Sequence, residues 1–166
     1  MIILYYGGQK SGKSKLAEKK ARKIARKNNQ KPYYIATYDN SYFDKEMKER
    51  VTTHKKQRKD YFHTIEETHD FLKVIKKGET YLVDCLSMWI LNHINTKPKK
   101  LFKQLKKLKK ANTNIILVLN NVNNGVIPYD KQSRKFVDMT GVIGQKVVKI
   151  SDKVYEVTLG VAQKIK

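Results

Sequence analysis

Cysteine is almost missing from this sequence of 166 residues: Cys85 is the only one, so no disulfide can form within the chain. The few Cys and His residues also lack the spacing of a zinc site. No apolar run approaches the roughly 20 residues that span a bilayer, and the opening residues lack a basic leader. The chain has three prolines, eight glycines and no hinge-like segment, so we expect one domain over residues 1–166. From the single cysteine and the lack of a long apolar run, we expect a cytoplasmic protein with no membrane span.

Acidic residues are also scarce. The 15 Asp and Glu face 36 Lys and Arg, which gives a formal charge of +21 and suggests a polyanionic partner. However, only five of these basic residues are arginine, the side chain that base and phosphate recognition favours. Because the lysines are spread over every helical segment, we interpret them as solvated faces and expect no nucleic acid as partner.

Hydrophobic residues make up 40% of the chain, and their spacing alternates between two patterns. Short continuous apolar runs predict buried strands at 1–6, 32–37, 62–65, 81–86, 114–119, 153–159 and 161–165. Amphipathic periodicity predicts helices at 14–28, 44–59, 67–77, 87–95, 98–111 and 130–150. This alternation is typical of a three-layer α/β sandwich with a mostly parallel sheet of about seven strands.

The first strand and helix flank a glycine-rich motif of the form G-x-x-x-x-G-K-S. Backbone N–H groups of such a turn bind phosphate oxygens, and the helix N-terminus adds its positive dipole end. Lys13 is placed to bind the β- and γ-phosphates, and the Ser14 hydroxyl to ligate Mg²⁺. The motif predicts a P-loop NTPase domain of RecA-like type, with a phosphate site formed by Gly7, Gly8, Gln9, Lys10, Ser11, Gly12, Lys13 and Ser14.

A P-loop needs a second anchor for Mg²⁺, usually an acid that ends a neighbouring apolar strand. Asp84 is the only acid in such a position, at the end of the strand predicted over 81–86. The alternative is that Asp84 caps the helix that begins near Ser87, and the two roles are compatible. We expect Cys85 beside it to be a small buried packing residue.

Histidine is the remaining nucleophile to consider. His63, His69 and His93 lie in or near amphipathic stretches, and we interpret them as structural or exposed. His54 is followed by cations at positions 55, 56 and 58, which favour its neutral form and would offset phosphate charge. From the residues alone, His54 can be either a nucleophile or a structural histidine.

Taken together, these motifs resemble the bifunctional adenosylcobinamide kinase/adenosylcobinamide-phosphate guanylyltransferase family of cobalamin assembly. The similarity runs nearly the whole length of the chain. It includes GGQKSGKS at the start, YIAT at 34–37, the Arg50–His54–Arg58 segment, VDCLSMWILN at 83–92, NNVNNGVIP at 120–128, the helix with Arg134, Phe136, Asp138, Gly141 and Gln145, and a tail from Gly160 to Lys164.

The resemblance implies two reactions with Mg²⁺, ATP, GTP and adenosylcobinamide. A nucleoside triphosphate first phosphorylates the hydroxyl of adenosylcobinamide. His54 then attacks the α-phosphorus of GTP, and the resulting GMP–histidine passes GMP to adenosylcobinamide phosphate. The family also implies a homo-oligomer, typically a trimer.

The same resemblance implies which residues surround the guanosine nucleotide. Beyond the P-loop, they are Ala36, Thr37, Tyr38, Lys55, Lys56, Gln57, Arg58, Glu66 and Asp84. The carboxylate of Glu66 has the acceptors that guanine N1–H and its amino group require.

The chain departs from the family pattern at several positions. Asn121 replaces an acid and Asn123 a glycine in the loop after the strand at 114–119, and Thr53 and Gly144 replace a histidine and an asparagine. Loss of the acid leaves open an alternative in which guanylyl transfer is kept and kinase activity is lost. A third alternative, from another functional class, is a RecA-like ATPase module that binds nucleic acid through the +21 charge.

Overall fold

The computed structural model describes residues 1–39, 58 and 60–166. Its strands are β1 (Ile2–Gly7), β2 (Tyr33–Ala36), β3 (His63–Glu66), β4 (Thr80–Asp84), β5 (Asn114–Asn120), β6 (Lys153–Thr158) and β7 (Val161–Lys164). Its helices are α1 (Lys13–Arg26), the 3₁₀ turn η2 (Phe71–Lys73), α3 (Leu86–Asn92), α4 (Pro98–Lys110) and α5 (Lys131–Ile150). Of the helix predicted at 44–59, only residue 58 is among the described residues.

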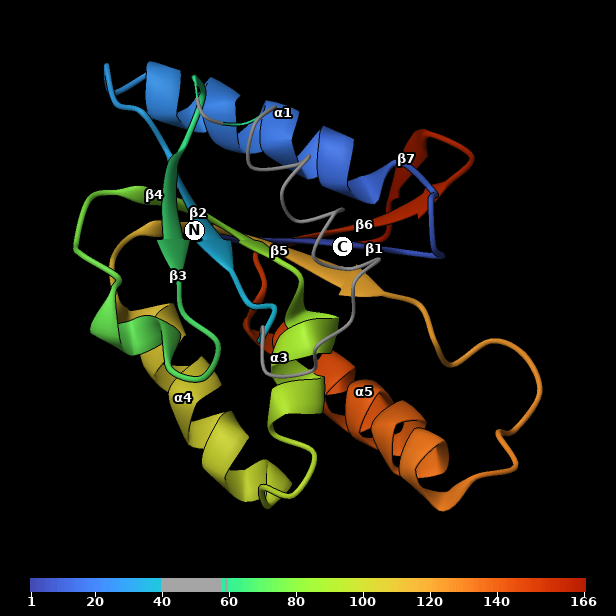
Figure 1. Cartoon of the computed structure of the whole chain (residues 1–166). Helices are drawn as coiled ribbons and strands as arrows, with labels where there is room; N and C mark the ends of the chain where they lie inside the picture. Colours follow the sequence, from blue (N-terminus) through green and yellow to red (C-terminus); the bar gives the residue numbers. More distant parts are fainter. Residues whose placement is uncertain (40–57, 59) are drawn as a thin grey trace.

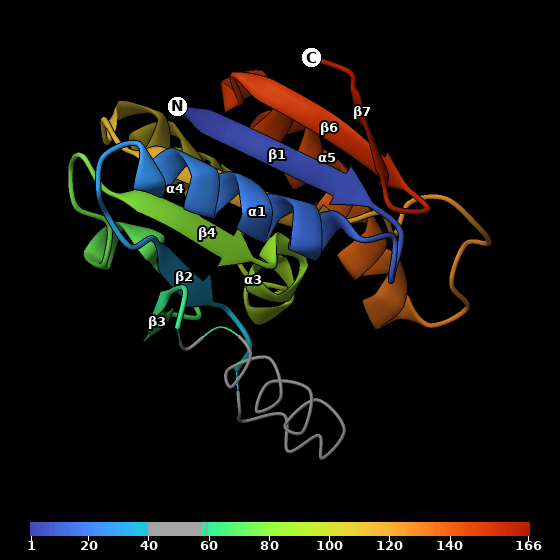
Figure 2. The same cartoon turned by 90° about the horizontal axis from the view of Figure 1, so that it is seen from above.

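All these strands join one sheet in the order β3-β2-β4-β5-β1-β6-β7. Every pairing is parallel except that of β6 with β7, which form an antiparallel hairpin at one edge. Among the described residues, Figures 1 and 2 show α1 over one face of the sheet, while α3, α4 and α5 cover the other. The predicted three-layer α/β sandwich with a mostly parallel sheet is therefore confirmed.

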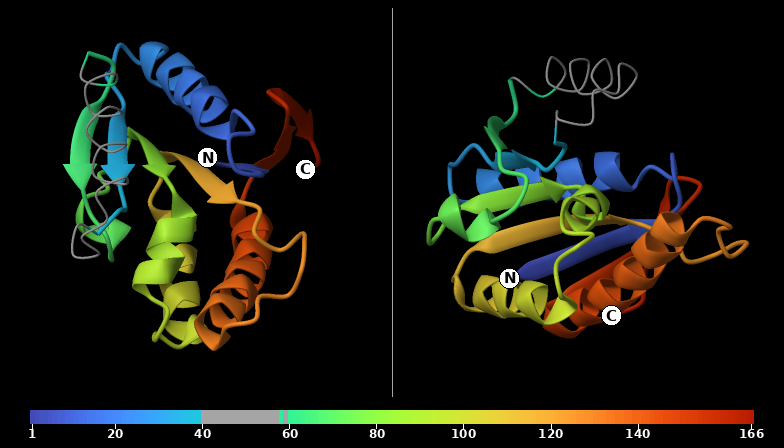
Figure 3. Two further views of the ribbon diagram at one scale, coloured as in Figure 1. Left: turned by 45° about the vertical axis from the view of Figure 1, so that its right-hand side comes forward. Right: turned by 60° about the horizontal axis from the view of Figure 1, so that its bottom comes forward.

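The period of two along β1 divides the core between the two faces. Ile3 and Tyr5 point toward α1, where Ala17 and Ala21 let the helix approach the sheet closely. Leu4 belongs to the larger cluster on the opposite face, with residues of α3, α4 and α5. Figure 3 shows this second layer from two further sides. Because both faces are covered, the central strands are apolar throughout, as the sequence pattern predicts.

The helix predicted at 67–77 is wrong, since only the 3₁₀ turn at Phe71–Lys73 forms there. Two carboxylates bond backbone N–H groups in this segment, including that of Leu72, which would bond the carbonyl oxygen of Thr68 in a continuous helix. Glu67 accepts from the N–H groups of His69 and Asp70, and Asp70 accepts from that of Leu72. These side-chain bonds favour a series of turns over a continuous helix.

No helix formed by the described residues combines the length and the apolar character that a bilayer crossing requires.

Candidate nucleotide site

The turn between β1 and α1 has the geometry of a phosphate cradle. A Cβ atom on Gly7 would collide with the carbonyl oxygen of Val157 and lie 2.8 Å from Ser11 Oγ, so only glycine fits there. Gly12 has φ +93° immediately before α1, a conformation that side chains other than glycine rarely adopt. The motif expected from the sequence therefore stands where a buried strand meets a helix N-terminus.

Lys13 lies inside this turn with only 6% of its surface exposed. Its Nζ donates to the carbonyl oxygen of Gly8 at 2.9 Å. Burial lowers the pKa of Lys13, while the negative charge of Asp84 opposes that effect. The ammonium group of Lys13 is thus held over the cradle, where it could form an ion pair with a bound phosphate.

Ser14 and Asp84 come together across the sheet, although 70 residues separate them in sequence. The Ser14 hydroxyl donates to Asp84 Oδ1 at 3.3 Å. The N-cap position of α3 is Cys85 rather than Asp84, and the helix has no capping hydrogen bond from its N-cap side chain. A hydroxyl and a carboxylate are hard oxygen donors of the kind that hold Mg²⁺ together with substrate phosphates, so these two residues fit that ion.

At the carboxyl edge of the sheet, two more predicted residues lie in one row with Asp84. Ala36 is in register with Glu66 of β3 on one side and with Asp84 of β4 on the other. In an open α/β sheet, ligands bind beyond the carboxyl ends of the strands. The topology therefore places Glu66 at the same edge as the phosphate cradle, with β2, β4 and β5 between its strand and β1.

The turn that follows β2 is fixed by hydrogen bonds from the segment after β4. Thr37 is fully buried, and its Oγ1 donates to the carbonyl oxygen of Cys85 at 2.8 Å. The Asn92 amide Nδ2 donates both to the carbonyl oxygen of Thr37 at 2.8 Å and to that of Thr68 at 3.0 Å. Asn92 thus connects the turns after β2 and β3. Sequence reasoning missed this residue, and its only signal was its place in the VDCLSMWILN motif.

Cys85 and Tyr34 pack beside these turns. Cys85 is half-buried, and its Sγ accepts from Asn120 Nδ2 at 3.8 Å. Burial, together with the charge of Asp84, raises the pKa of Cys85 to about 11, so the thiol stays protonated near neutrality. The Tyr34 hydroxyl donates to the carbonyl oxygen of Asp84 at 3.2 Å, and burial raises the pKa of Tyr34 well above its ordinary value. These groups pack and position the site but supply no nucleophile.

Arg58 lies against α1, where it makes two contacts with neighbouring side chains. Its Nε donates to Glu18 Oε1 at 2.7 Å, and its guanidinium stacks over the ring of Tyr34 at 3.9 Å. Glu18 stands one helical turn after Ser14, so this ion pair flanks the cradle. His54, Lys55, Lys56 and Gln57 lie outside the described residues. Tyr38 is described and half-buried, directly after Thr37.

The other histidines occupy the positions expected of structural or exposed residues. His63 and His69 are exposed, on β3 and after it. His93 is buried and bonds the carbonyl oxygen of Trp89 through Nδ1 at 2.8 Å. Because a carbonyl oxygen only accepts, Nδ1 carries the proton in this contact.

The β6–β7 hairpin also touches the cradle, a contact that the sequence pattern did not reveal. The turn of the β6–β7 hairpin lies beside the P-loop, and Figures 1 and 2 both show the two next to each other. The N–H of Gly160 donates to the carbonyl oxygen of Ser11 at 2.8 Å. A Cβ on Gly12 would lie 3.3 Å from the Cα of Gly160. The hairpin therefore braces the outer side of the phosphate turn.

Solved structures support the fold that carries this site. Flagellar accessory protein FlaH from Methanocaldococcus jannaschii superposes with a TM-score of 0.56 over 99% of this chain and 77% of that protein, at 17% sequence identity. At that identity the similarity concerns the fold alone.

The similarity to sequence relatives covers the whole chain. This chain is 31% identical to the bifunctional adenosylcobalamin biosynthesis protein CobP of Pseudomonas aeruginosa, over all of this chain and 98% of that protein. It is 25% identical to the bifunctional adenosylcobalamin biosynthesis protein CobU of Escherichia coli, over the full length of both. The family model described as cobinamide kinase / cobinamide phosphate guanyltransferase matches residues 3–165. With a P-loop, its strand-end acid and a match of this extent, the chain belongs to the cobinamide kinase / cobinamide phosphate guanyltransferase family.

Proposed function

We propose that this protein phosphorylates adenosylcobinamide and then joins GMP from GTP to the product, giving adenosylcobinamide-GDP in cobalamin biosynthesis. The observation that carries the proposal is the contact of Ser14 with Asp84 beside the buried Lys13, within a chain that matches the family over residues 3–165. The printed functions of the relatives agree with it.

In the kinase step, the P-loop holds the triphosphate of the nucleotide. Backbone N–H groups of the turn and the ammonium of Lys13 bind its oxygens, and their positive character stabilises the charge that develops as the γ-phosphoryl leaves. Ser14 and Asp84 would hold Mg²⁺, which neutralises charge between the β- and γ-phosphates when it is bound. The hydroxyl oxygen of adenosylcobinamide forms a new bond to the γ-phosphorus as the bond from that phosphorus to the bridging oxygen breaks. The nucleoside diphosphate departs, and the hydroxyl proton is released to solvent.

In the transferase step, a neutral nitrogen of His54 attacks the α-phosphorus of GTP. The bond from the α-phosphorus to the bridging oxygen breaks, and pyrophosphate leaves toward Lys13 and the P-loop amides. A phosphate oxygen of adenosylcobinamide phosphate then attacks the same phosphorus. The P–N bond breaks and returns the electron pair to His54.

We assign the guanine base to the β3 end of the carboxyl edge, away from the P-loop. Glu66 ends β3 in register with Ala36, and its carboxylate accepts hydrogen bonds, as guanine N1–H and the amino group require. The turn of Ala36, Thr37 and Tyr38 lies between this residue and Asp84. Lys55, Lys56, Gln57 and Arg58 are proposed to complete the nucleotide site around His54.

A second candidate, guanylyl transfer without kinase activity, is favoured by Asn121. Its N–H donates to the carbonyl oxygen of Gly7 at 2.8 Å, so it begins the loop that leaves the cradle. Its Oδ1 accepts from the N–H of Asn123 at 3.2 Å. An amide cannot take a proton from the acceptor hydroxyl as a carboxylate can.

Transfer of label from γ-labelled ATP to adenosylcobinamide distinguishes the two candidates. The two-reaction proposal predicts transfer by the wild type and a loss of about 100-fold or more in kcat/KM for Lys13→Ala, because a preorganised charge at the transition state is removed. Lys19→Ala, an exposed lysine on α1, is the matched control and should resemble the wild type. Absence of transfer by the wild type would leave only the second candidate.

A further inference from the structure

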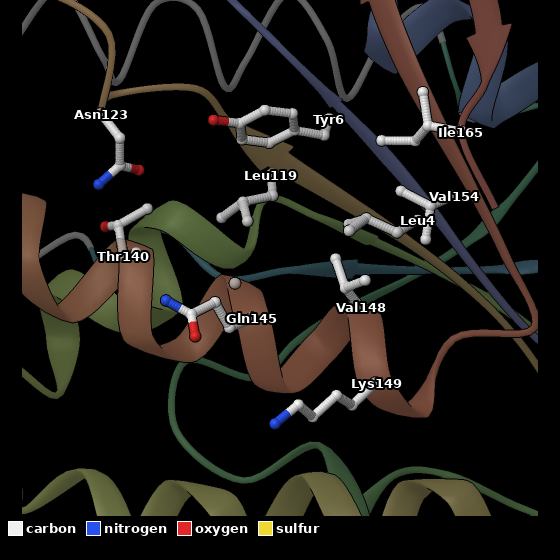
Figure 4. Close-up of a pocket in the computed structure, with 12 residues that line it drawn as sticks. Leu4, Tyr6, Leu119, Asn123, Thr140, Gln145, Val148, Lys149, Val154 and Ile165 are labelled. Atoms are coloured by element: carbon white, nitrogen blue, oxygen red, sulfur yellow. The ribbon is translucent and has the colours of Figure 1, made fainter.

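A cavity of about 620 Å³ lies on the α5 face of the sheet. Its floor comes from β1, β5 and β6, one wall from α5, and its far end from the chain terminus. The residues that line it are Leu4, Tyr6, Leu119, Asn123, Thr140, Gly141, Gly144, Gln145, Val148, Lys149, Val154 and Ile165. Figure 4 shows Leu4, Leu119, Val148, Val154 and Ile165 gathered around the same hollow. Nothing in the two reactions above has used this space.

The chemistry of the cavity is mostly apolar with a few polar groups at its border. Leucine, valine and isoleucine form the floor and the far end, while the amides of Asn123 and Gln145 and the hydroxyl of Tyr6 lie nearer the carboxyl edge (Figure 4). Burial raises the pKa of Tyr6, with a further contribution from Glu156, so its hydroxyl remains a neutral donor. Such lining suits a largely apolar ligand that carries amide groups. It does not suit a triphosphate, for which the cavity offers one cation, Lys149.

The helical wall contains two glycines that face the cavity. A Cβ on Gly141 would lie 3.1 Å from Asn123 Nδ2, and one on Gly144 would lie 3.4 Å from Leu119 Cδ2. Glycine inside a helix costs about 1 kcal/mol relative to alanine. In α5 the two glycines let the helix lie close to Asn123 and Leu119 at the border of the cavity, where a larger side chain would crowd both residues.

The cavity also adjoins the phosphate cradle through the backbone. Tyr6 directly precedes Gly7, and the N–H of Asn121 bonds the carbonyl oxygen of Gly7. Asn123, two residues further along the same loop, lines the cavity. A ligand seated here can therefore extend an arm over the carboxyl edge toward a phosphate held in the P-loop.

We propose that this cavity binds the rim of the corrinoid acceptor and so directs its hydroxyl-bearing arm to the P-loop. The proposal rests on the proposed function, because it assigns a place to that reaction's substrate. A corrinoid rim carries methyl and carboxamide groups, which match the apolar floor and the amides of Asn123 and Gln145. The volume accommodates part of the macrocycle, and the rest lies outside in solvent.

The test fills the cavity without touching the nucleotide site. Val148→Phe places a larger side chain in the cavity, and Val142→Phe makes the same change on an exposed position of α5 that does not line it. Equilibrium dialysis with cobinamide should show at least 10-fold weaker binding by Val148→Phe and unchanged binding by Val142→Phe. Gln145→Ala, an exposed residue whose replacement leaves the core intact, should weaken corrinoid binding about 3- to 10-fold. Binding of a fluorescent ATP analogue checks that each variant is folded.

Each result bears on the proposal. Wild-type binding of cobinamide that neither Val148→Phe nor Gln145→Ala changes would overturn the cavity assignment and leave the proposed function intact. Wild type that binds the nucleotide but no cobinamide would overturn both. A change in sedimentation of Val148→Phe, with corrinoid binding unaltered, would assign the cavity to contact between copies of the chain and overturn the proposal.

Discussion

At the scale of single residues, Asn92 links two nucleotide-site turns that are far apart in sequence. Its amide bonds the carbonyl oxygens of Thr37 and Thr68, 55 and 24 residues away. Thr37 is fully buried, so its carbonyl has no access to water if the amide is removed. Asn92 is therefore a positioning residue for the turn that carries Thr37 and Tyr38.

We predict that Asn92→Ala weakens GTP binding and lowers the free energy of unfolding by about 1–3 kcal/mol, the cost of a buried unpaired carbonyl. Asn95→Ala is the matched control, since Asn95 is exposed and its Oδ1 accepts from Lys135 Nζ at 3.0 Å. Urea unfolding and titration with GTP check both effects. A GTP affinity of Asn92→Ala equal to that of the control would remove its positioning role.

At the scale of elements, the β6–β7 hairpin stabilises the P-loop from outside. Gly160 makes this possible with φ +84°, which lets its N–H reach the carbonyl oxygen of Ser11. The neighbouring Leu159 also has a positive φ, 51°, and is 93% exposed. The shape of this tight turn sets where the hairpin meets the cradle.

We predict that Gly160→Ala raises the Kd for ATP several-fold, because a side chain at positive φ strains the turn that holds Ser11. Gly78→Ala is a matched control: Gly78 has φ +85°, open space around it and no contact with the P-loop. Both variants should lose about 1–2 kcal/mol of stability from the same backbone strain. Equal nucleotide affinities in isothermal titration calorimetry would contradict a role of the hairpin in the cradle.

The sequence predicted those elements whose signal is local. Apolar runs located the strands, and the G-x-x-x-x-G-K-S spacing located the P-loop with Lys13 and Ser14. The expectation that every strand is buried was wrong for β3 and β7, which lie at the two edges of the sheet and are largely exposed. The helix at 67–77 failed because apolar periodicity does not reveal how the carboxylates of Glu67 and Asp70 bond the backbone. Contacts of Asn92 and Gly160 depend on the order of strands in the sheet, which periodicity does not determine.

At the scale of the whole molecule, the chain carries a formal charge of +21 but only five arginines, of which Arg50 lies outside the described residues. Three of the five arginines are engaged within the fold. Arg58 pairs with Glu18, Arg22 stacks over Tyr61 at 3.9 Å, and Arg134 donates to the backbone oxygens of Pro128 and Tyr129. The homo-oligomer, the trimer and the cytoplasmic location stay predictions.

We predict that polynucleotides leave the rate of ATP hydrolysis unchanged at 150 mM salt. Any binding measured at low salt should reflect lysines near the phosphates and fall steeply between about 50 and 200 mM salt. Fluorescence anisotropy with a labelled single strand, together with an ATPase assay, measures both. Stimulation of hydrolysis by the polynucleotide at 150 mM salt would favour the RecA-like nucleic-acid module instead.

Covalent labelling with α-labelled GTP tests the guanylyl transfer most directly. Incubated with Mg²⁺, the wild-type protein should retain label in a bond that acid breaks and base does not, as expected of a phosphoramidate. His63→Ala, which alters an exposed histidine on β3, should be labelled like the wild type, and His54→Ala should carry no label. Label on His54→Ala, or its absence from the wild type, would contradict the account.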